Sequence, residues 1–143
     1  MPLSTALVIA GALVAVSIAL GWLLRKMDGR RRSGGDLRLR AEDLALAPTA
    51  TLVQFSTEMC TRCPQVRRLL RDIAGAHAGV EVAEIDLTHR NDLATRYRVL
   101  QTPTTFLVDA SGIVISRWGG LPDRAAINDA LESVLNHQPQ EQQ

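Results

Sequence analysis

The stretch TLVQFSTEMCTRCP, residues 51–64, contains both cysteines of the chain, Cys60 and Cys63. Its first five residues are mainly apolar and predict a buried strand. After the cysteines, apolar residues recur at spacings of three, four and seven, which is the period of an amphipathic helix. These residues are Val66, Leu69, Leu70 and Ile73. The cysteine pair is therefore expected where a strand ends and a helix begins.

This position has chemical consequences for the two thiols. The first turn of a helix offers unpaired N–H groups and the positive end of the helix dipole, and both favour a thiolate. Cysteines in such C-x-x-C sites can have pKa values lowered to roughly 3.5–7.5. Cys60 lies nearer the loop and the expected helix start, so it is the candidate nucleophile. Cys63, one turn in and more buried, is the candidate resolving thiol that closes on the first.

A second segment strengthens this interpretation. Residues 101–108, QTPTTFLV, place Thr102-Pro103 directly before an apolar strand about forty residues later. Together the two segments resemble the thioredoxin superfamily over about residues 48–136. The resemblance implies an α/β thioredoxin-like fold, a mixed central sheet flanked by helices. It also implies that Pro103 is cis and that its loop lies against the cysteine pair and helps to bind substrate.

Further positions follow from the same resemblance. Met59 stands where thioredoxins usually carry Trp beside the first cysteine, and Gly119 matches a glycine near the substrate groove, although a plain turn is the alternative. Gln54 occupies the place of a buried acid that is thought to take the proton of the resolving thiol, and glutamine cannot act as a base. The usual partner lysine on the next strand is replaced by Val82. Arg62, between the cysteines, would favour the Cys60 thiolate unless it is ordinary surface charge.

Local patterns predict the remaining elements. The expected order from residue 51 onward is β-α-β-α-β-β-α, with helices on both faces of the sheet. Four details are specific: a short edge strand at Leu37–Arg40, a helix from an N-cap at Thr88 to Tyr97, a hairpin at Ser111-Gly112, and a last helix opening at Pro122-Asp123.

The N-terminus is strongly apolar. Residues 3–24 carry no charge, and 22 helical residues would span about 33 Å, enough for a bilayer core. Trp22 lies where an interfacial aromatic residue is common. A cleaved signal peptide is the alternative, but residues 1–5 contain no basic side chain. We expect residues 1–24 to be a retained transmembrane helix, as in a membrane-anchored bacterial thioredoxin-like protein.

Charge around this segment is one-sided. Residues 25–40 contain seven basic and two acidic residues, and none precedes the helix. The positive-inside rule then places the thioredoxin-like domain in the cytoplasm. We expect a basic juxtamembrane linker and lead-in at residues 25–47, which could also hold anionic lipid head groups, a domain at 48–136 and a flexible tail at 137–143.

Several classes of function are disfavoured. A structural zinc site needs four ligands, and beyond the cysteines the chain offers only His77, His89 and His137. Copper delivery by this fold usually needs three residues between the cysteines, not two. Aromatic residues make up 3% of the chain, too few for stacking on bases, and the basic residues lie beside the apolar segment. We expect no metal, no nucleic acid and no cofactor besides a Cys60–Cys63 disulfide.

The sequence thus predicts a membrane-anchored thiol–disulfide oxidoreductase that reduces protein disulfides and is recharged by a thiol electron donor. Two alternatives stay open. Met59 and Gln54 suit a membrane-tethered binding module that keeps the fold but turns over little. The third possibility is an outward-facing thiol oxidase or isomerase, which the basic flank argues against.

Overall fold

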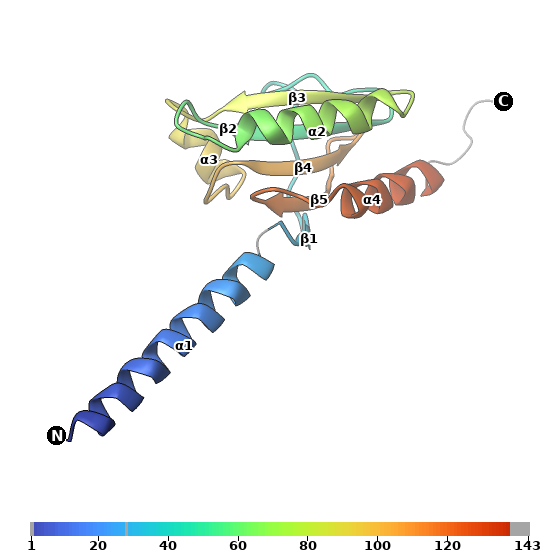
Figure 1. Cartoon of the computed structure of the whole chain (residues 1–143). Coiled ribbons are helices and arrows are strands. Elements are labelled where there is room, and N and C mark those ends of the chain that lie inside the picture. Colours follow the sequence, from blue (N-terminus) through green and yellow to red (C-terminus); the bar gives the residue numbers. More distant parts are fainter. Residues whose placement is uncertain (1, 28, 138–143) are drawn as a thin grey trace.

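A computed structural model of the protein describes residues 2–27 and 29–137. Its centre is a five-stranded mixed sheet in the order β1-β5-β4-β2-β3 (Figure 1). Strands β2 and β3 are parallel, and the other neighbours are antiparallel. The strands are β1 Arg31–Ser33, β2 Ala50–Ser56, β3 Val80–Asp86, β4 Thr104–Asp109 and β5 Val114–Gly119. From β2 onward the predicted order of elements and the thioredoxin-like fold are confirmed.

Helices cover the sheet on both faces. One face packs against α2, Cys63–Gly75, and α4, Arg124–His137, through a cluster that includes Leu52, Val66 and Ile127. The other face carries the short helix α3, Asn91–Arg96, in a cluster with Val53 and Phe55. All seven residues of β2 are buried, because this strand lies between two neighbours and beneath both layers. The loop with the cysteines therefore extends from the most enclosed strand of the fold.

Two predicted details of the lead-in and α3 are wrong. Residues 37–40 form no strand; Arg38 makes only an isolated bridge to Ile113, and the edge strand is β1. The chain bends after β1, so residues 31–33 take the edge of β5 while buried Leu37 and Leu39 pack beneath the sheet. Helix α3 begins three residues after Thr88. The N-cap position is Arg90, and the Thr88 hydroxyl instead donates to Asp86 and accepts from the Glu58 amide.

The lead-in is also tied to α3. The Tyr97 hydroxyl donates to Asp43, and the Arg96 guanidinium lies 2.9 Å from the same carboxylate. The hydrogen bond from Tyr97, followed by contributions from Arg96, holds the pKa of Asp43 below its usual range, while burial raises the pKa of Tyr97. The segment predicted as linker and lead-in thus supplies a strand, core leucines and a carboxylate that binds the end of α3. The domain limits themselves stay predictions.

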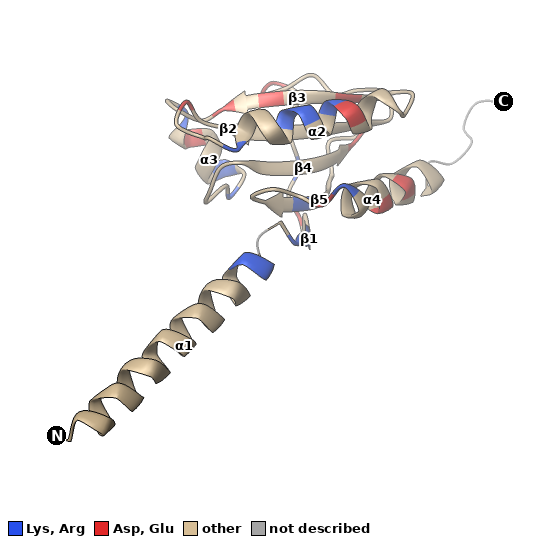
Figure 2. Cartoon of the chain, in the orientation of Figure 1, with Lys and Arg blue, Asp and Glu red and all other residues tan. Residues whose placement is uncertain are grey.

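Helix α1, Leu3–Met27, extends away from the sheet, and none of its residues is buried (Figure 1). It is long and apolar enough to cross a membrane, a property that signal sequences share. Figure 2 shows its only charges at the end that joins the rest of the chain, where Arg25 and Lys26 lie in the last turn. The predicted tail at 137–143 lies almost entirely outside the described residues.

Candidate active site

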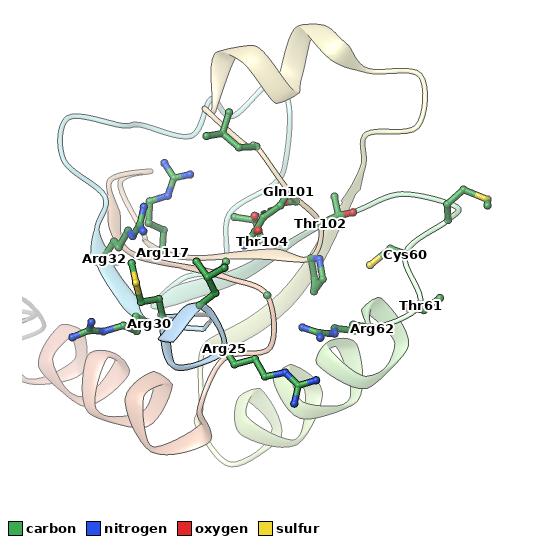
Figure 3. Close-up of a pocket in the computed structure, with 17 residues that line it drawn as sticks. Arg25, Arg30, Arg32, Cys60, Thr61, Arg62, Gln101, Thr102, Thr104 and Arg117 are labelled. Atoms are coloured by element: carbon green, nitrogen blue, oxygen red, sulfur yellow. Dashed lines mark hydrogen bonds between the residues drawn. The ribbon is translucent and has the colours of Figure 1, made fainter. Parts of the chain in front are cut away.

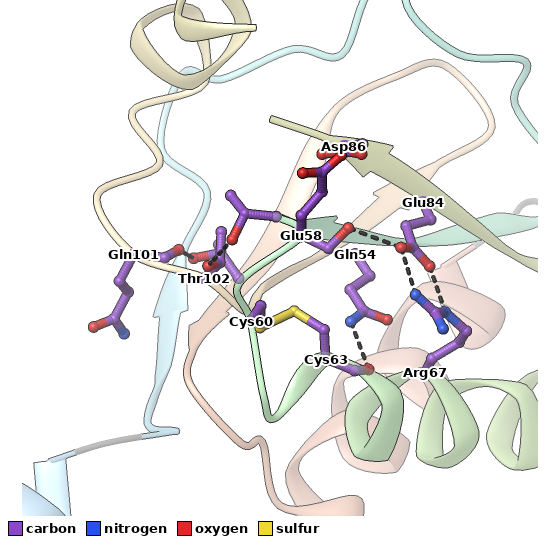
Figure 4. The surroundings of a disulfide bond; sticks show 12 residues. Gln54, Glu58, Cys60, Cys63, Arg67, Glu84, Asp86, Gln101 and Thr102 are labelled. Atoms are coloured by element: carbon purple, nitrogen blue, oxygen red, sulfur yellow. Dashed lines mark hydrogen bonds and ion pairs between the residues drawn. A yellow bond between two sulfur atoms is a disulfide. The ribbon is translucent and has the colours of Figure 1, made fainter. Parts of the chain in front are cut away.

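A disulfide joins Cys60 and Cys63 where the sequence places the strand–helix junction (Figure 4). The S–S distance is 2.07 Å and the Cα atoms are 5.5 Å apart. Helix α2 starts at Cys63, which is later in the chain than a start near Cys60. Cys60 therefore lies in the turn before the helix. Pro64 then falls in the first helical turn, where its missing N–H breaks no helical hydrogen bond.

The two sulfur-bearing residues differ in exposure. Cys63 is 2% exposed, whereas Cys60 is half-buried and lines a surface cavity. An incoming disulfide can therefore reach Cys60, while Cys63 is sheltered against the sheet. The roles of Cys60 as nucleophile and Cys63 as resolving thiol stay predictions.

Gln54 lies beneath the disulfide on β2 and is fully buried. Its side-chain N–H donates to the Cys63 carbonyl at 2.9 Å. Its side-chain oxygen has no hydrogen-bond partner within the described part of the chain. The predicted burial of Gln54 is confirmed, and the group beside Cys63 is a neutral amide that cannot take up a proton at ordinary pH.

An ion pair next to Gln54 was missed by the sequence analysis. Glu84 on β3 pairs in register with Gln54, accepts a hydrogen bond from Ser56 at 2.8 Å and binds Arg67 of α2 at 2.6 Å. The hydrogen bond from Arg67, assisted by Ser56, lowers the pKa of Glu84. Two spacings in the sequence are compatible with this ion pair. Glu84 shares a strand face with Val82, and Arg67 follows Cys63 by about one helical turn.

The second predicted segment lies against the disulfide. The Thr102–Pro103 peptide bond is cis, as the resemblance implies. The hydroxyls of Thr102 and Thr57 are 3.2 Å apart, which joins this loop to the end of β2. Gly120 donates its N–H to the Pro103 carbonyl at 2.8 Å. The Thr102–Pro103 loop is thereby fixed beside Cys60.

A cavity of about 730 Å³ opens in front of Cys60 (Figure 3). The predicted positions Met59, Arg62, Thr102, Pro103 and Gly119 all line it. Met59 and another lining residue, Leu100, are 90% and 96% exposed. The cavity thus combines a reactive sulfur with a proline loop and an apolar rim, which suits a polypeptide segment. Gln54 and Cys63 are not among the residues that line the cavity.

Arginines dominate the charge of this cavity. Five line it, from the end of α1, the segment around β1, the cysteine turn and β5: Arg25, Arg30, Arg32, Arg62 and Arg117. No acidic side chain of the described residues is among its lining. Positive charge near Cys60 favours its thiolate form over the thiol.

No group of three or more His, Cys, Asp or Glu side chains within residues 2–27 and 29–137 comes close enough together to hold a metal ion. The Cys60–Cys63 disulfide supports thiol–disulfide exchange. A cysteine pair at a strand–helix junction, beside a cis-proline loop that precedes the neighbouring strand β4, defines a thioredoxin-like redox centre.

Comparisons with known proteins agree with this class. The family model described as Thioredoxin matches residues 41–133, more than half of the chain, and the protein therefore belongs to the thioredoxin family. The probable thioredoxin-2 of Caenorhabditis elegans is 30% identical over 95 residues, 66% of this chain and 65% of that protein. The mitochondrial thioredoxin of Mus musculus is 31% identical over 88 residues, 61% of this chain and 50% of that protein.

Among solved structures, a mutant thioredoxin from Halobacterium salinarum NRC-1 superimposes with a TM-score of 0.52 at 28% identity, covering 60% of this chain and 74% of that one. The chain spans less than two thirds of the length of the worm and mouse relatives. The likeness therefore covers the thioredoxin-like part of this chain and not the whole length of these relatives.

Proposed function

We propose that the protein is a membrane-anchored thiol–disulfide oxidoreductase that reduces protein disulfides. The observation that carries the proposal is the Cys60–Cys63 disulfide. Cys60 faces a cavity beside the Thr102–Pro103 loop, and Cys63 is buried. Met59, Thr102, Pro103 and Gly119 would border the bound substrate. Gln54 and Arg62 would modulate the two thiols.

The reaction needs the pair in its dithiol form. The Cys60 thiolate attacks one sulfur of the substrate disulfide, forms a mixed disulfide and expels the other substrate sulfur as a thiolate. The Cys63 thiolate then attacks the Cys60 sulfur, which forms the Cys60–Cys63 disulfide and releases the second substrate thiol. Two electrons pass from the pair to the substrate. An external thiol donor must return them before the next turnover.

Reduction of an insulin-type disulfide by the full chain in detergent tests this activity. The native protein should reduce it with a thiol donor present, Cys60→Ser should be inactive, and Cys63→Ser should accumulate mixed disulfides that identify partners. Equal activity of Cys60→Ser would contradict the assignment. A folded, reduced protein that transfers no electrons would favour a tethered binding module, the alternative that exposed Met59 and neutral Gln54 suggest.

Location decides the direction of electron flow. With α1 in the membrane, the basic residues that follow it favour a cytoplasmic domain, where thiol pools would keep the pair reduced. An alkaline-phosphatase fusion after Gln143 should be inactive. Full activity of that fusion would instead support an outward-facing oxidase or isomerase.

A further inference from the structure

Resting on the proposed function, we propose that the cavity in front of Cys60 selects disulfides whose reacting sulfur is flanked by carboxylates. Its positive charge comes from parts of the chain that are far apart in sequence. Figure 3 shows Cys60 and Arg62 on one side of the cavity and Arg30, Arg32 and Arg117 on the other. A ligand that touches the sulfur therefore meets cationic groups from several directions.

Four of the cavity arginines differ from the arginines outside the cavity that form ion pairs with acidic side chains. Six other arginines form ion pairs: Arg40, Arg67, Arg90, Arg96, Arg98 and Arg124. Among the described residues, Arg25, Arg30, Arg32 and Arg117 pair with no carboxylate. A carboxylate ligand in the cavity would pair with these four guanidinium groups, which have no carboxylate partner among the described residues.

Arg117 is the most constrained of the set. Its guanidinium donates to the Arg98 carbonyl at 2.7 Å and lies 5.2 Å from the centre of the Phe106 ring. Burial, and then the positive charges of Arg32 and Arg98, lower the pKa of Arg117. The fold thus holds the Arg117 cation in place although Arg32 and Arg98 repel it. A bound anion would relieve this repulsion. A guanidinium pairs well with a carboxylate because two N–H groups can bind both oxygens.

The remaining lining points to a disulfide ligand. Cys60 and Pro103 belong to the same cavity, so an occupant lies at the reacting sulfur. The volume of about 730 Å³ is within the range of ligand sites, and exposed Met59 and Leu100 offer apolar contacts. Carboxylates beside a disulfide could come from a small molecule such as glutathione disulfide or from an acidic protein segment. The electron transfer would follow the two-step exchange described above.

The test compares kcat/KM of the full chain, in nanodiscs of neutral lipid, for peptide disulfides flanked by Glu, Gln or Lys and for glutathione disulfide. We expect the Glu peptide to exceed the Gln peptide about tenfold at low salt, with the ratio falling toward one as salt screens the charges. The ratio of kcat/KM for the Glu peptide to that for the Gln peptide should also fall in three single variants: Arg30→Gln, at an exposed position, Arg32→Gln and Arg117→Gln. Arg90→Gln, which breaks a remote Arg90–Asp92 pair, is the matched control and should keep the native ratio.

The relative rates for glutathione disulfide and the Glu peptide distinguish the small from the polypeptide source. Equal kcat/KM for the Glu and Gln peptides, with insulin-type reduction intact, would overturn the inference and leave the proposed function standing. Loss of the preference only in anionic-lipid nanodiscs would assign the arginines to lipid head groups and also overturn it. Failure to reduce any disulfide would remove both proposals.

Discussion

The two cysteines of the disulfide lie in different electrostatic surroundings. Cys60 opens onto a cavity lined by arginines, whereas Cys63 is 2% exposed and lies against the neutral amide of Gln54. Positive charge favours the thiolate that begins an exchange. A neutral amide gives no help in removing a proton from the thiol that completes it. The structure therefore supports the first half of the reaction better than the second.

Glu84, a carboxylate on the strand beside Gln54, does not alter this contrast. Glu84 is held by Arg67 and Ser56, and the hydrogen bond from Arg67 lowers its pKa. A carboxylate with a lowered pKa is a weaker proton acceptor near neutrality. The Arg67–Glu84 pair therefore does not supply a strong base for the Cys63 thiol.

The largest effect should come from placing a base beside Cys63. Gln54→Asp introduces a buried carboxylate whose pKa rises toward neutrality, and we expect resolution of the mixed disulfide to become at least about tenfold faster near pH 7. Single-turnover reduction of a model disulfide from pH 6 to 9 measures this rate. Gln54→Asn is the matched neutral control. An unchanged rate in a folded Gln54→Asp protein would show that water or another group already serves as the base.

The same variant predicts a pH-dependent loss of stability. Because burial raises the folded-state pKa of the new carboxyl above its unfolded value of about 3.9, its protonated form is favoured in the fold. Stability should be highest below that unfolded value and fall as the pH rises through the folded-state pKa. Denaturant unfolding at pH 5 and pH 9 should therefore differ more for Gln54→Asp than for the native protein.

A smaller effect is expected at Asp43, on the opposite face of the sheet. Its folded-state pKa is lowered by Tyr97 and Arg96, so its stabilising contribution is present above about pH 3.9 and is lost as the pH falls through the folded-state pKa. Asp43→Asn should cost about 1–2 kcal/mol at pH 7. Denaturant unfolding at pH 7 and pH 3 measures both effects. An equal loss at both pH values would contradict the charged hydrogen bond.

The smallest effect should follow removal of the Arg67–Glu84 pair. Both side chains are about one-third exposed, at 32% and 33%, so solvent screens them. Arg67→Gln should lower stability by less than about 1 kcal/mol and leave Cys60 reactivity unchanged, as measured by unfolding and by alkylation. A large drop in Cys60 reactivity would mean that the two sides of the disulfide are electrostatically coupled.

The sequence was most informative where one local pattern suffices. Strand β2, the helical period after Cys63 and the Thr102–Pro103 loop are each visible in a short window. Strand β1 was not predictable in this way, because its exposed, basic residues show no burial pattern and its partner β5 lies about eighty-five residues later. The Asp43–Tyr97 bond, the Arg67–Glu84 pair and the gathering of arginines in front of Cys60 likewise depend on tertiary proximity.

The measurement that tests the contrast most directly is site-resolved alkylation of the reduced full chain across pH 5 to 9. Mass spectrometry of peptides labelled over time gives separate rates for Cys60 and Cys63. At pH 7 we expect Cys60 to react at least about tenfold faster than Cys63, because Cys60 is more accessible and the nearby arginines favour a thiolate there. Labelling of Cys60 should slow in the double variant Arg32→Gln, Arg117→Gln. Equal rates, or faster labelling of Cys63, would contradict the assignment of the two sulfurs.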